Sequence, residues 1–264
     1  MFKRMTLTAA LAGAVFLGAC EAATDTPAKA AASESAAPDA PVAINADLDL
    51  DEVRRKFPAI NPADIKESPV QGWFEIDSGG QVLYISGDGR YAMRGDLIDL
   101  DTRVNLTDLR RNTSRQQLMA SIGEDDMIVY TPDGDVTHSV TIFTDVDCGY
   151  CRKLHQEMED YHSEGIEVRY LFYPRSGPNT ASWEKATNVW CSDDRNSALT
   201  QAKAGQRLAA QQCDAGLIND HFEAGRKVGL RGTPAIVTEN GELISGYMPA
   251  KALRTRIEQG ALAR

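Results

Sequence analysis

The sequence has too few basic residues to favour a nucleic-acid partner. Its 264 residues hold 28 Lys and Arg against 38 Asp and Glu, which gives a formal net charge of −10 at pH 7. A surface that binds phosphates or anionic lipid needs clustered basic side chains, and an acidic excess disfavours both partners. Hydrophobic residues make up 42% and charged residues 25%, the balance of a chain with a packed core. We therefore expect a globular protein that binds no nucleic acid.

Histidine and cysteine are also scarce, which limits the kinds of site that the chain can build. There are four His and five Cys, and the cysteines are Cys20, Cys148, Cys151, Cys191 and Cys213. A structural zinc ion usually takes four ligands in two closely spaced pairs. Only one such pair exists, because Cys191 and Cys213 are far apart in the sequence and have no neighbouring His. We predict a protein with no metal site and no cofactor.

The apolar run that opens the chain is too short to cross a bilayer as a permanent helix. Residues 5–17 are apolar and follow a short basic start, the pattern of a signal peptide over residues 1–19. Leu-Gly-Ala-Cys at residues 17–20 is similar to the lipobox of bacterial lipoproteins, in which the cysteine is acylated; ordinary cleavage a few residues later is the alternative. We expect an exported protein with Cys20 as its lipidation candidate. Acylation or loss of Cys20 leaves an even number of cysteines, as suits an oxidising compartment.

A tether and a small α+β domain are expected next. Residues 20–45 are mostly Ala, Pro, Ser, Thr and Asp, which predicts a flexible tether. The domain over residues 46–104 should begin with a short helix that Asp49 or Asp51 caps and Pro58 ends. Three strands should follow, separated by Gly-containing turns, at residues 73–76, 82–86 and 91–100. About sixty residues are marginal alone and leave sheet edges exposed, so we predict that this domain pairs with an identical copy.

The second half of the chain alternates strands and helices. Residues 105–125 are polar with sparse apolar positions, which predicts a mostly solvated linker helix. A domain over residues 126–264 follows, and its apolar period becomes helical at Cys148, so that a helix begins there. Strands are expected at residues 127–130, 136–144, 166–173, 235–238 and 243–246. Helices are expected at residues 182–190, 197–208, 218–228 and 250–257. This order predicts an α/β domain.

Cys148-Gly149-Tyr150-Cys151 is the stretch of the sequence that indicates chemistry. Two cysteines separated by two residues can close a small disulfide, and the start of a helix favours a thiolate on the first of them. Such a thiolate attacks other disulfides through a mixed disulfide. A buried structural bridge and half of a zinc site are the alternatives. We interpret Cys148 and Cys151 as a redox pair.

Several segments resemble the DsbC/DsbG family of periplasmic thiol:disulfide interchange proteins, within the thioredoxin superfamily. The matching segments, in order along the chain, are Phe143-Thr144-Asp145, Cys148-Gly149-Tyr150-Cys151, Lys153-Leu154-His155, Val168-Arg169-Tyr170-Leu171, Trp190-Cys191 and Gly232-Thr233-Pro234-Ala235. The short motif alone would indicate only the superfamily. The small domain before it and the second cysteine pair make the resemblance DsbC-like, over about residues 47 to 258.

The resemblance implies a fold, partners and a function. The fold would be an α+β N-terminal dimerisation domain joined by a linker helix to an α/β thioredoxin-like domain. The protein would be a periplasmic V-shaped homodimer whose two active sites face a peptide-binding cleft, kept reduced by a DsbD-type membrane reductase. It would act as a disulfide isomerase or reductase on misfolded disulfide-containing exported proteins. The alternatives are a DsbG-like reductase of single oxidised cysteines and a holdase chaperone.

The resemblance also assigns roles to particular residues. Cys148 would be the nucleophile and Cys151 the resolving thiol, while Gly149 and Tyr150 would tune the redox potential. Thr233 and Pro234 would form a cis-proline loop that faces the active cysteines and binds substrate backbone. Cys191 and Cys213 would form a structural disulfide.

Two residues near the motif leave their roles open at this stage. Asp147 could cap the helix, yet its negative charge beside Cys148 would oppose thiolate formation. His155 stands at helical spacing from Cys151 and is either a plain surface residue or one that tunes the site.

Overall fold

The computed structural model describes residues 48–58, 60–78, 80–210 and 213–262. The predicted signal peptide, Cys20 and the whole of the predicted tether lie outside the described residues. No helix of the described part is both long enough and apolar enough to cross a membrane.

The first described elements form a small antiparallel sheet with one helix against it. Helix α1 (Leu50–Lys56) begins after Asp49, whose carboxylate accepts a hydrogen bond from the backbone N–H of Glu52 at 3.0 Å, as the sequence predicted. A single 3₁₀ turn, Pro62–Asp64, leads into the sheet. The strands lie in the order β1 (Ile65–Glu67), β2 (Trp73–Ser78), β3 (Gln81–Ser86) and β4 (Ala92–Arg94).

The two faces of this sheet bury different side chains because successive strand residues point to opposite faces. On one face Phe74, Ile76 and Ile85 pack with Val53 of α1 into a small apolar core. On the other face the Tyr84 hydroxyl bonds to the Thr107 hydroxyl at 2.5 Å. Helix α2 (Leu106–Ala120) begins beside this contact, so the sheet is held between two helices.

The strand predicted over residues 91–100 is wrong in its extent. Only Ala92–Arg94 pair with β3. Beyond Gly95 the backbone bonds to the start of α2 instead, because the Leu97 N–H donates to the Thr107 hydroxyl at 2.7 Å. Strand β1 escaped prediction, since three residues with two exposed side chains carry no alternating apolar signal.

The predicted linker helix is α2 (Leu106–Ala120), which Asn105 caps through a hydrogen bond to the backbone N–H of Asp108 at 3.0 Å. The apolar residues of α2 that reach the following domain lie near the end of the helix. Leu118 and Met119, with Ile122 just beyond, pack against the core of the following domain. The earlier turns of the helix are polar and partly exposed, as predicted.

A five-stranded mixed sheet organises the second domain. Its order is β5 (Ile128–Tyr130), β7 (Ile166–Phe172), β6 (His138–Thr144), β8 (Ala235–Thr238) and β9 (Leu243–Ser245). Strands β6 and β7 pair in parallel and the other pairs are antiparallel. The 3₁₀ turn Glu124–Asp126 precedes β5. The remaining elements are α3 (Gly149–Gln156), α4 (Met158–Ser163), α5 (Ala181–Trp190), α6 (Arg195–Lys203), α7 (Gly216–Val228) and α8 (Ala250–Leu262).

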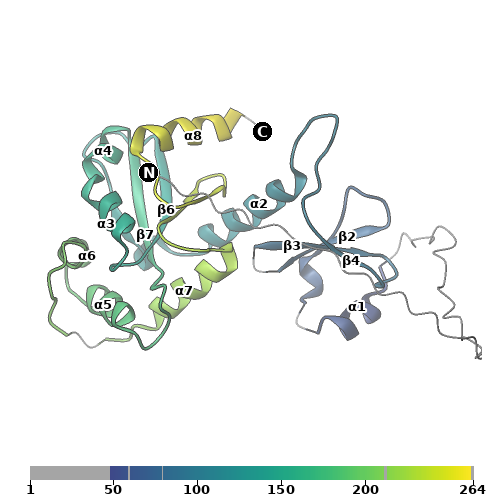
Figure 1. Cartoon of the computed structure of the whole chain (residues 1–264), viewed down its shortest axis with the longest axis horizontal. Coiled ribbons are helices and arrows are strands. Elements are labelled where there is room, and N and C mark those ends of the chain that lie inside the picture. The colour runs from purple at the N-terminus through teal and green to yellow at the C-terminus, as the bar shows by residue number, and fades with distance from the viewer. Residues whose placement is uncertain (1–47, 59, 79, 211–212, 263–264) are drawn as a thin grey trace, which may run out of the picture. The chain divides into compact units, whose positions relative to one another are not determined.

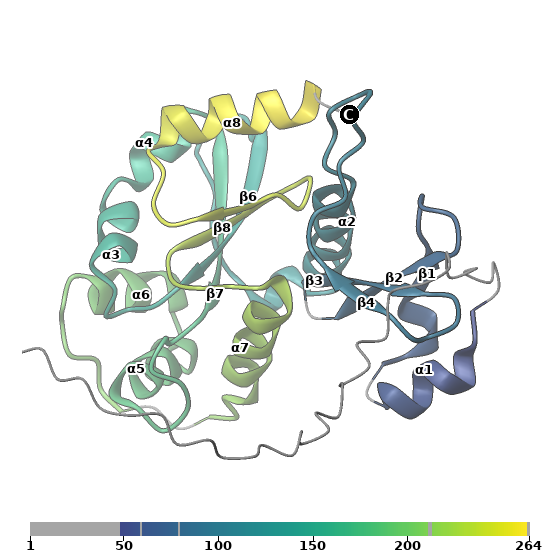
Figure 2. The same cartoon turned by 45° about the vertical axis from the view of Figure 1, so that its right-hand side comes forward.

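Helices cover both faces of this sheet (Figure 1). On one face α3 and α4 pack with Val140, Ile142 and Tyr170 in the larger core. Helix α7 lies against the other face, where Phe143 and Leu171 are buried (Figure 2). Strand β6 is therefore buried on both sides, and the loop that leaves it is held by packing above and below.

Two helix predictions differ from the structure. The helix expected from Cys148 breaks at Glu157 into α3 and α4, where the backbone leaves helical geometry. The helix expected over residues 197–208 ends at Lys203, because Gly205 takes a positive φ of 82° that continues no helix.

Candidate functional site

The paired cysteines lie where β6 ends and α3 begins. Cys148 is the residue just before the helix and Cys151 lies in its first turn. Both are free thiols, and both are buried. The unpaired N–H groups of a helix start carry partial positive charge, which favours a thiolate at this position.

A loop from the far end of the domain faces Cys148. The Cys148 thiol donates a hydrogen bond to the backbone carbonyl of Thr233 at 3.2 Å, and the Thr233–Pro234 peptide bond is cis. Strand β8 begins directly after Pro234. The chain thus brings residues 85 positions apart into contact at the site.

Burial by itself raises the pKa of the Cys148 thiol. The backbone N–H of Cys151, the Thr233 side chain and the charge of Arg175 favour the thiolate and more than offset burial, so the pKa of Cys148 lies below its ordinary value. Cys151 lies deeper. Burial raises its pKa above the ordinary value, and the charge of Lys203 offsets only part of that rise. The surroundings therefore favour ionisation of the Cys148 thiol and disfavour ionisation of the Cys151 thiol.

Asp145 holds the loop between β6 and α3 in place. One of its oxygens accepts from the backbone N–H of Asp147 at 2.9 Å and from the Ser182 hydroxyl at 2.6 Å. The other accepts from the backbone N–H and the Nε of Arg175, each at 3.1 Å. Burial raises the pKa of this carboxyl, but these hydrogen bonds outweigh burial and hold the pKa below its usual range. Arg175 is thereby oriented beside the thiols.

Asp147 does not cap α3, which has no side-chain cap. Its carboxylate instead pairs with Lys185 at 2.6 Å and with Arg152 at 3.2 Å. Two cations thus balance the charge that the sequence placed beside Cys148, which weakens its opposition to a thiolate.

His155 is not a surface residue, which corrects one of the two readings of the sequence. It is 8% exposed and bonds to the Tyr170 hydroxyl at 3.2 Å and to the Thr200 hydroxyl at 3.0 Å. Burial and the nearby charge of Lys203 lower its pKa to about 3. His155 is therefore neutral at ordinary pH and belongs to a polar cluster beneath the site.

The middle residues of the motif lie at the surface. A Cβ added at Gly149 would meet nothing within 4 Å. Tyr150 is 64% exposed, and its ring stacks on Tyr247 with centroids 6.2 Å apart. The Lys153 ammonium group also lies over the Tyr247 ring, 4.7 Å from the ring centroid. An exposed aromatic pair thus flanks the thiols.

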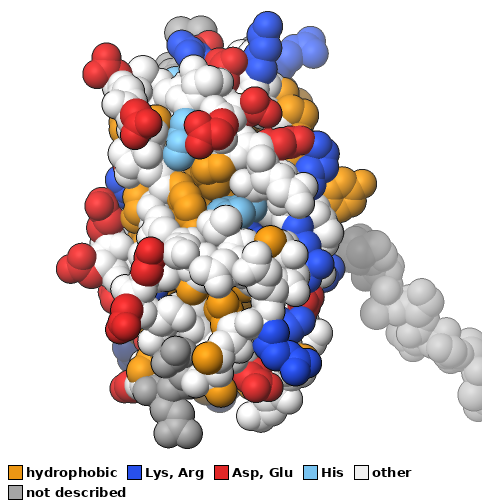
Figure 3. Space-filling view, turned by 90° about the vertical axis from the view of Figure 1, so that its left-hand side faces the viewer, with side chains coloured by type: hydrophobic (Ala, Val, Ile, Leu, Met, Phe, Trp, Pro, Cys, Tyr) orange, Lys and Arg blue, Asp and Glu red, His pale blue; other side chains and the backbone are white. Residues whose placement is uncertain are grey.

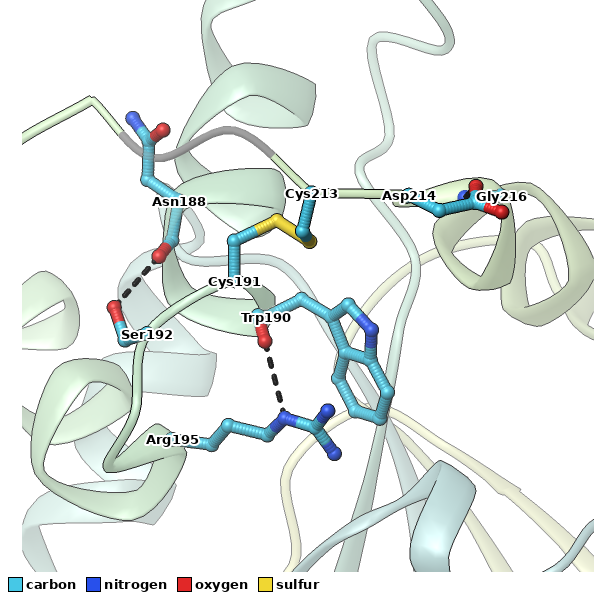
Figure 4. The surroundings of a disulfide bond; sticks show 8 residues. All are labelled: Asn188, Trp190, Cys191, Ser192, Arg195, Cys213, Asp214 and Gly216. Carbon is cyan, nitrogen blue, oxygen red and sulfur yellow. Dashed lines mark hydrogen bonds between the residues drawn. A yellow bond between two sulfur atoms is a disulfide. The ribbon is translucent and has the colours of Figure 1, made fainter.

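The other two cysteines form a disulfide at the end of α5 (Figure 4). Cys191 follows the last residue of that helix, and Cys213 precedes α7. The guanidinium of Arg195 covers the neighbouring Trp190 ring at 3.5 Å, while its Nε donates to the Trp190 carbonyl at 3.0 Å. Both cysteines of this bridge follow the two free thiols in the sequence. The bridge links the end of α5 covalently to the segment before α7.

Sequence reasoning missed Arg175, Lys185 and Lys203, which act through contacts between distant elements. Lys203 alone left a signal, because it stands four residues after Leu199 on the apolar face of its helix. Among the described residues there is no group of three or more His, Cys, Asp or Glu side chains that could hold a metal ion.

Comparison with known proteins agrees with both domains. The family model described as "Thioredoxin-like domain" matches residues 124–261, and that described as "Disulfide bond isomerase protein N-terminal domain" matches residues 28–108. The chain is thus a thioredoxin-like protein with the N-terminal domain of the disulfide bond isomerases.

Its relatives narrow the class to one family. The chain is similar to the thiol:disulfide interchange protein DsbC of Escherichia coli strain K12, with 36% identity over 202 residues that cover 76% of this chain and 83% of that protein. It is 37% identical over 215 residues to DsbC of Haemophilus influenzae, covering 80% of this chain and 92% of that protein. A solved disulfide interchange protein from Neisseria gonorrhoeae is 26% identical, with a TM-score of 0.43, and the match covers 52% of this chain and 97% of that one. The chain belongs to the DsbC family and is a thiol:disulfide oxidoreductase, as the resemblance implied.

Proposed function

We propose that this protein rearranges incorrect disulfides in exported proteins, with Cys148 as the nucleophile and Cys151 as the resolving thiol. The observation that supports this most is the pair of free thiols with opposite pKa shifts, one of which faces the Thr233 carbonyl. A thiol that ionises readily starts exchange, and one that stays protonated does not compete with it.

The reaction begins when the Cys148 thiolate attacks one sulfur of a substrate disulfide. A Cys148–substrate bond forms, the substrate disulfide breaks, and the second substrate sulfur leaves as a thiolate. Isomerisation follows when another substrate thiolate attacks the mixed disulfide and releases Cys148. Reduction follows when Cys151 attacks Cys148 instead. The enzyme thiols are then oxidised to a Cys148–Cys151 disulfide, and the substrate disulfide is reduced to two thiols.

Substrate backbone binds at Thr233 and Pro234 in this proposal. The backbone groups of a loop that precedes a strand can pair with an extended segment. Gly149 leaves room above the thiols, and Tyr150 with Tyr247 offers an aromatic surface to apolar side chains. The space-filling view of the side where α3 and α4 lie shows hydrophobic and histidine side chains grouped between charged ones (Figure 3). A misfolded chain with exposed apolar residues suits the aromatic surface of Tyr150 and Tyr247.

The small N-terminal domain makes the protein a homodimer in this proposal. Strand β4 is a short edge strand, and no other strand of the described residues pairs with its outer side, where a second copy could pair. Large apolar side chains are exposed just before it, on it and after it, namely Tyr91, Met93, Ile98 and Leu100. Pairing of two copies covers these residues and brings two active sites to one substrate.

The proposed compartment is the periplasm, which the protein would reach through its signal peptide. The lipobox-like segment favours a lipid anchor on Cys20. A DsbD-type membrane reductase returns Cys148 and Cys151 to their thiol forms. Labelling with a radioactive fatty acid tests the anchor, since only an acylated Cys20 carries the label and Cys20→Ser loses it.

Refolding of a scrambled multi-disulfide substrate tests the central proposal. Cys148→Ala should abolish refolding, because Cys151, the other free thiol among the described residues, is buried and burial raises its pKa. Cys151→Ala should leave trapped mixed disulfides with partial activity, since substrate thiols can still release the enzyme. Circular dichroism of each variant controls for folding. Equal activity of wild type and Cys148→Ala would contradict the proposal. Activity confined to a protein with one oxidised cysteine would favour the DsbG-like alternative.

A further inference from the structure

A buried lysine lies beneath the resolving cysteine. Lys203 is the last residue of α6 and is 3% exposed. Its Nζ donates to the Thr144 hydroxyl at 2.7 Å and approaches the backbone carbonyl of Cys151 at 3.4 Å. The same nitrogen lies 5.3 Å from the centroid of the Tyr170 ring. In the part of the chain that the structure describes, Lys203 forms no ion pair with a carboxylate.

An ammonium group without a buried counter-ion is costly to remove from water. Burial lowers the pKa of Lys203 to about 8, and Cys151 and Cys148 are the strongest influences that favour its charged form. A thiolate at Cys151 exists only while the resolving step proceeds. The lysine therefore lies where a negative charge forms during the reaction and not where one rests.

We propose that Lys203 is a positioning residue for resolution, whose positive charge stabilises the Cys151 thiolate when it attacks the mixed disulfide at Cys148. The inference rests on the proposed function, because it concerns the second half of the same exchange. Burial of Cys151 disfavours its thiolate and so slows its attack on Cys148. The charge of Lys203 offsets part of that effect.

The other charged and titratable groups around Lys203 do not substitute for it. Asp145 is held by Arg175, and Arg152 is paired with Asp147 at the surface. His155 is neutral, because its pKa is about 3. On β7, burial raises the pKa of the Tyr170 hydroxyl well above its ordinary value, so that this group is neutral too.

The resolving step balances without a further reactant. The Cys151 sulfur gives up its proton and attacks Cys148, a Cys148–Cys151 bond forms, and the bond from Cys148 to the substrate sulfur breaks. The substrate sulfur leaves with the electron pair and ends as a thiol that carries one proton. The two enzyme sulfurs are oxidised and the substrate is reduced. Lys203 stabilises the thiolate during this step and is unchanged by it.

A coloured aromatic disulfide, dithio-bis-nitrobenzoate, separates the two halves of the reaction in the full-length reduced protein. Attack by Cys148 releases one coloured thiolate, and resolution by Cys151 releases the second. Stopped-flow absorbance from mildly acid to mildly alkaline pH gives a rate and a pH midpoint for each phase. The variants are Lys203→Met, Lys203→Gln and Lys203→Arg, with Lys251→Met on the exposed start of α8 as the matched control.

We expect the second phase of Lys203→Met to be about tenfold slower at neutral pH, with its midpoint about one pH unit higher, since one pKa unit is a tenfold change in thiolate fraction. The first phase should change less than about twofold. Lys203→Arg keeps the charge and should recover most of the second-phase rate. Lys203→Gln keeps hydrogen-bonding capacity without the charge, and it carries the same test if the Met variant does not fold.

The possible failures are distinct. A second phase with unchanged rate and midpoint in the Met or Gln variant would overturn the inference and leave the proposed function intact. Equal slowing of both phases would also overturn it, because that result indicates a purely structural lysine. Absence of a first phase in the wild-type protein would overturn the proposed function itself.

Discussion

The two thiols of the site differ because their surroundings differ within a single helical turn. Cys148 lies at the helix start, where backbone N–H groups and Arg175 favour the thiolate. Cys151 lies deeper, where burial favours the neutral thiol. Three residues of separation are enough, because one turn of a helix moves a side chain from its open end to its buried side.

The difference predicts selective alkylation. At about pH 7, a thiolate-specific reagent such as iodoacetamide should label Cys148 first and leave Cys151 mostly unlabelled, because the reagent reacts with the ionised form. Mass spectrometry of the reduced protein, sampled over time, measures the site and the rate. Cys148→Ser should remove the fast labelling. Equal labelling rates at both cysteines would contradict the geometry described above.

Two buried histidines predict a loss of stability in mild acid. Burial lowers the pKa of His155 to about 3 and that of His221 to about 4, from an ordinary value of 6.5. The unfolded chain takes up protons below pH 6.5 while the folded chain does not, so the free energy of unfolding falls as pH decreases through this window. Between about pH 7 and pH 5 the loss should reach up to about 2 kcal/mol for each histidine.

Urea unfolding at these two pH values measures the loss. Carboxylates with ordinary pKa values remain largely ionised at the lower one, so the histidines dominate the difference. His155→Gln keeps hydrogen-bonding capacity toward Tyr170 and Thr200 and should reduce the pH dependence by up to about 2 kcal/mol. An unchanged pH dependence in this variant would show that His155 is not held neutral.

At the scale of elements, two kinds of contact hold the site in the thioredoxin-like domain. Strands β6, β7 and β8 hold the site through a regular backbone ladder, in which Ile142 pairs with Tyr170 on one side and with Ile236 on the other. Helices α5 and α6 contribute single side chains to the site from outside the sheet, including Ser182 and Lys203. The second kind of contact depends on how the helices are held together.

The disulfide at Cys191 and Cys213 is one such restraint, and its loss should cost stability without ending activity. The bridge spans 22 positions in the sequence. A loop of that length corresponds to about 3 kcal/mol of unfolded-chain entropy. The double variant Cys191→Ala/Cys213→Ala should therefore unfold at a lower urea concentration while still reducing insulin through Cys148.

Reduction of the Cys191–Cys213 bridge in the wild-type protein provides a control for the double variant. Wild-type protein with this bridge reduced should unfold like the double variant, because both lack the same restraint. Circular dichroism follows the transition in both samples. Equal stability of the oxidised wild type and the double variant would mean that the bridge contributes nothing to folding.

At the scale of the whole molecule, the proposed isomerase needs its N-terminal domain although no catalytic residue lies there. The core of Val53, Phe74, Ile76 and Ile85 is small, both edge strands have three residues, and no strand of the described residues pairs with their outer sides. Covering one edge with a second copy adds buried apolar area that so small a domain lacks alone. Two joined copies hold a substrate near two Cys148 thiols, which raises the effective concentration of repeated attack.

A charge at this surface should separate reduction from isomerisation. Ile98 is 48% exposed in the segment after β4. Ile98→Glu should give a folded monomer, because a charge cannot be buried unpaired at the proposed interface. The monomer should still reduce insulin but should isomerise a scrambled substrate poorly. Light scattering measures the mass, and parallel activity assays measure the two reactions.

Val136→Glu provides a matched control in the thioredoxin-like domain. Val136 is 46% exposed, close to the value for Ile98, but it precedes β6 and belongs to the other domain. This variant should remain a dimer with both activities. A monomeric Ile98→Glu variant that isomerises as well as wild type would contradict the need for two joined sites.

Local pattern alone was enough to place the main elements and the two cysteines of the proposed redox pair. The two-residue spacing of Cys148 and Cys151, the β-branched run that became β6 and the helical period after it depend on neighbours in the chain. Chain neighbours also account for the Asp49 cap and most of α2. These features were predictable because backbone hydrogen bonding and amphipathic spacing act over a few residues.

Contacts between distant segments established the rest, and no local pattern encodes them. The extent of β4 depended on Thr107, which draws the Leu97 N–H away from the sheet. Lys185 and Arg152 neutralise Asp147, and Lys203 reaches Cys151 across 52 positions of sequence. Ionisation depends on burial and on the charges within a few ångströms, wherever they stand in the chain. The folded arrangement of helices around the sheet therefore sets the chemistry of two cysteines that the sequence had only located.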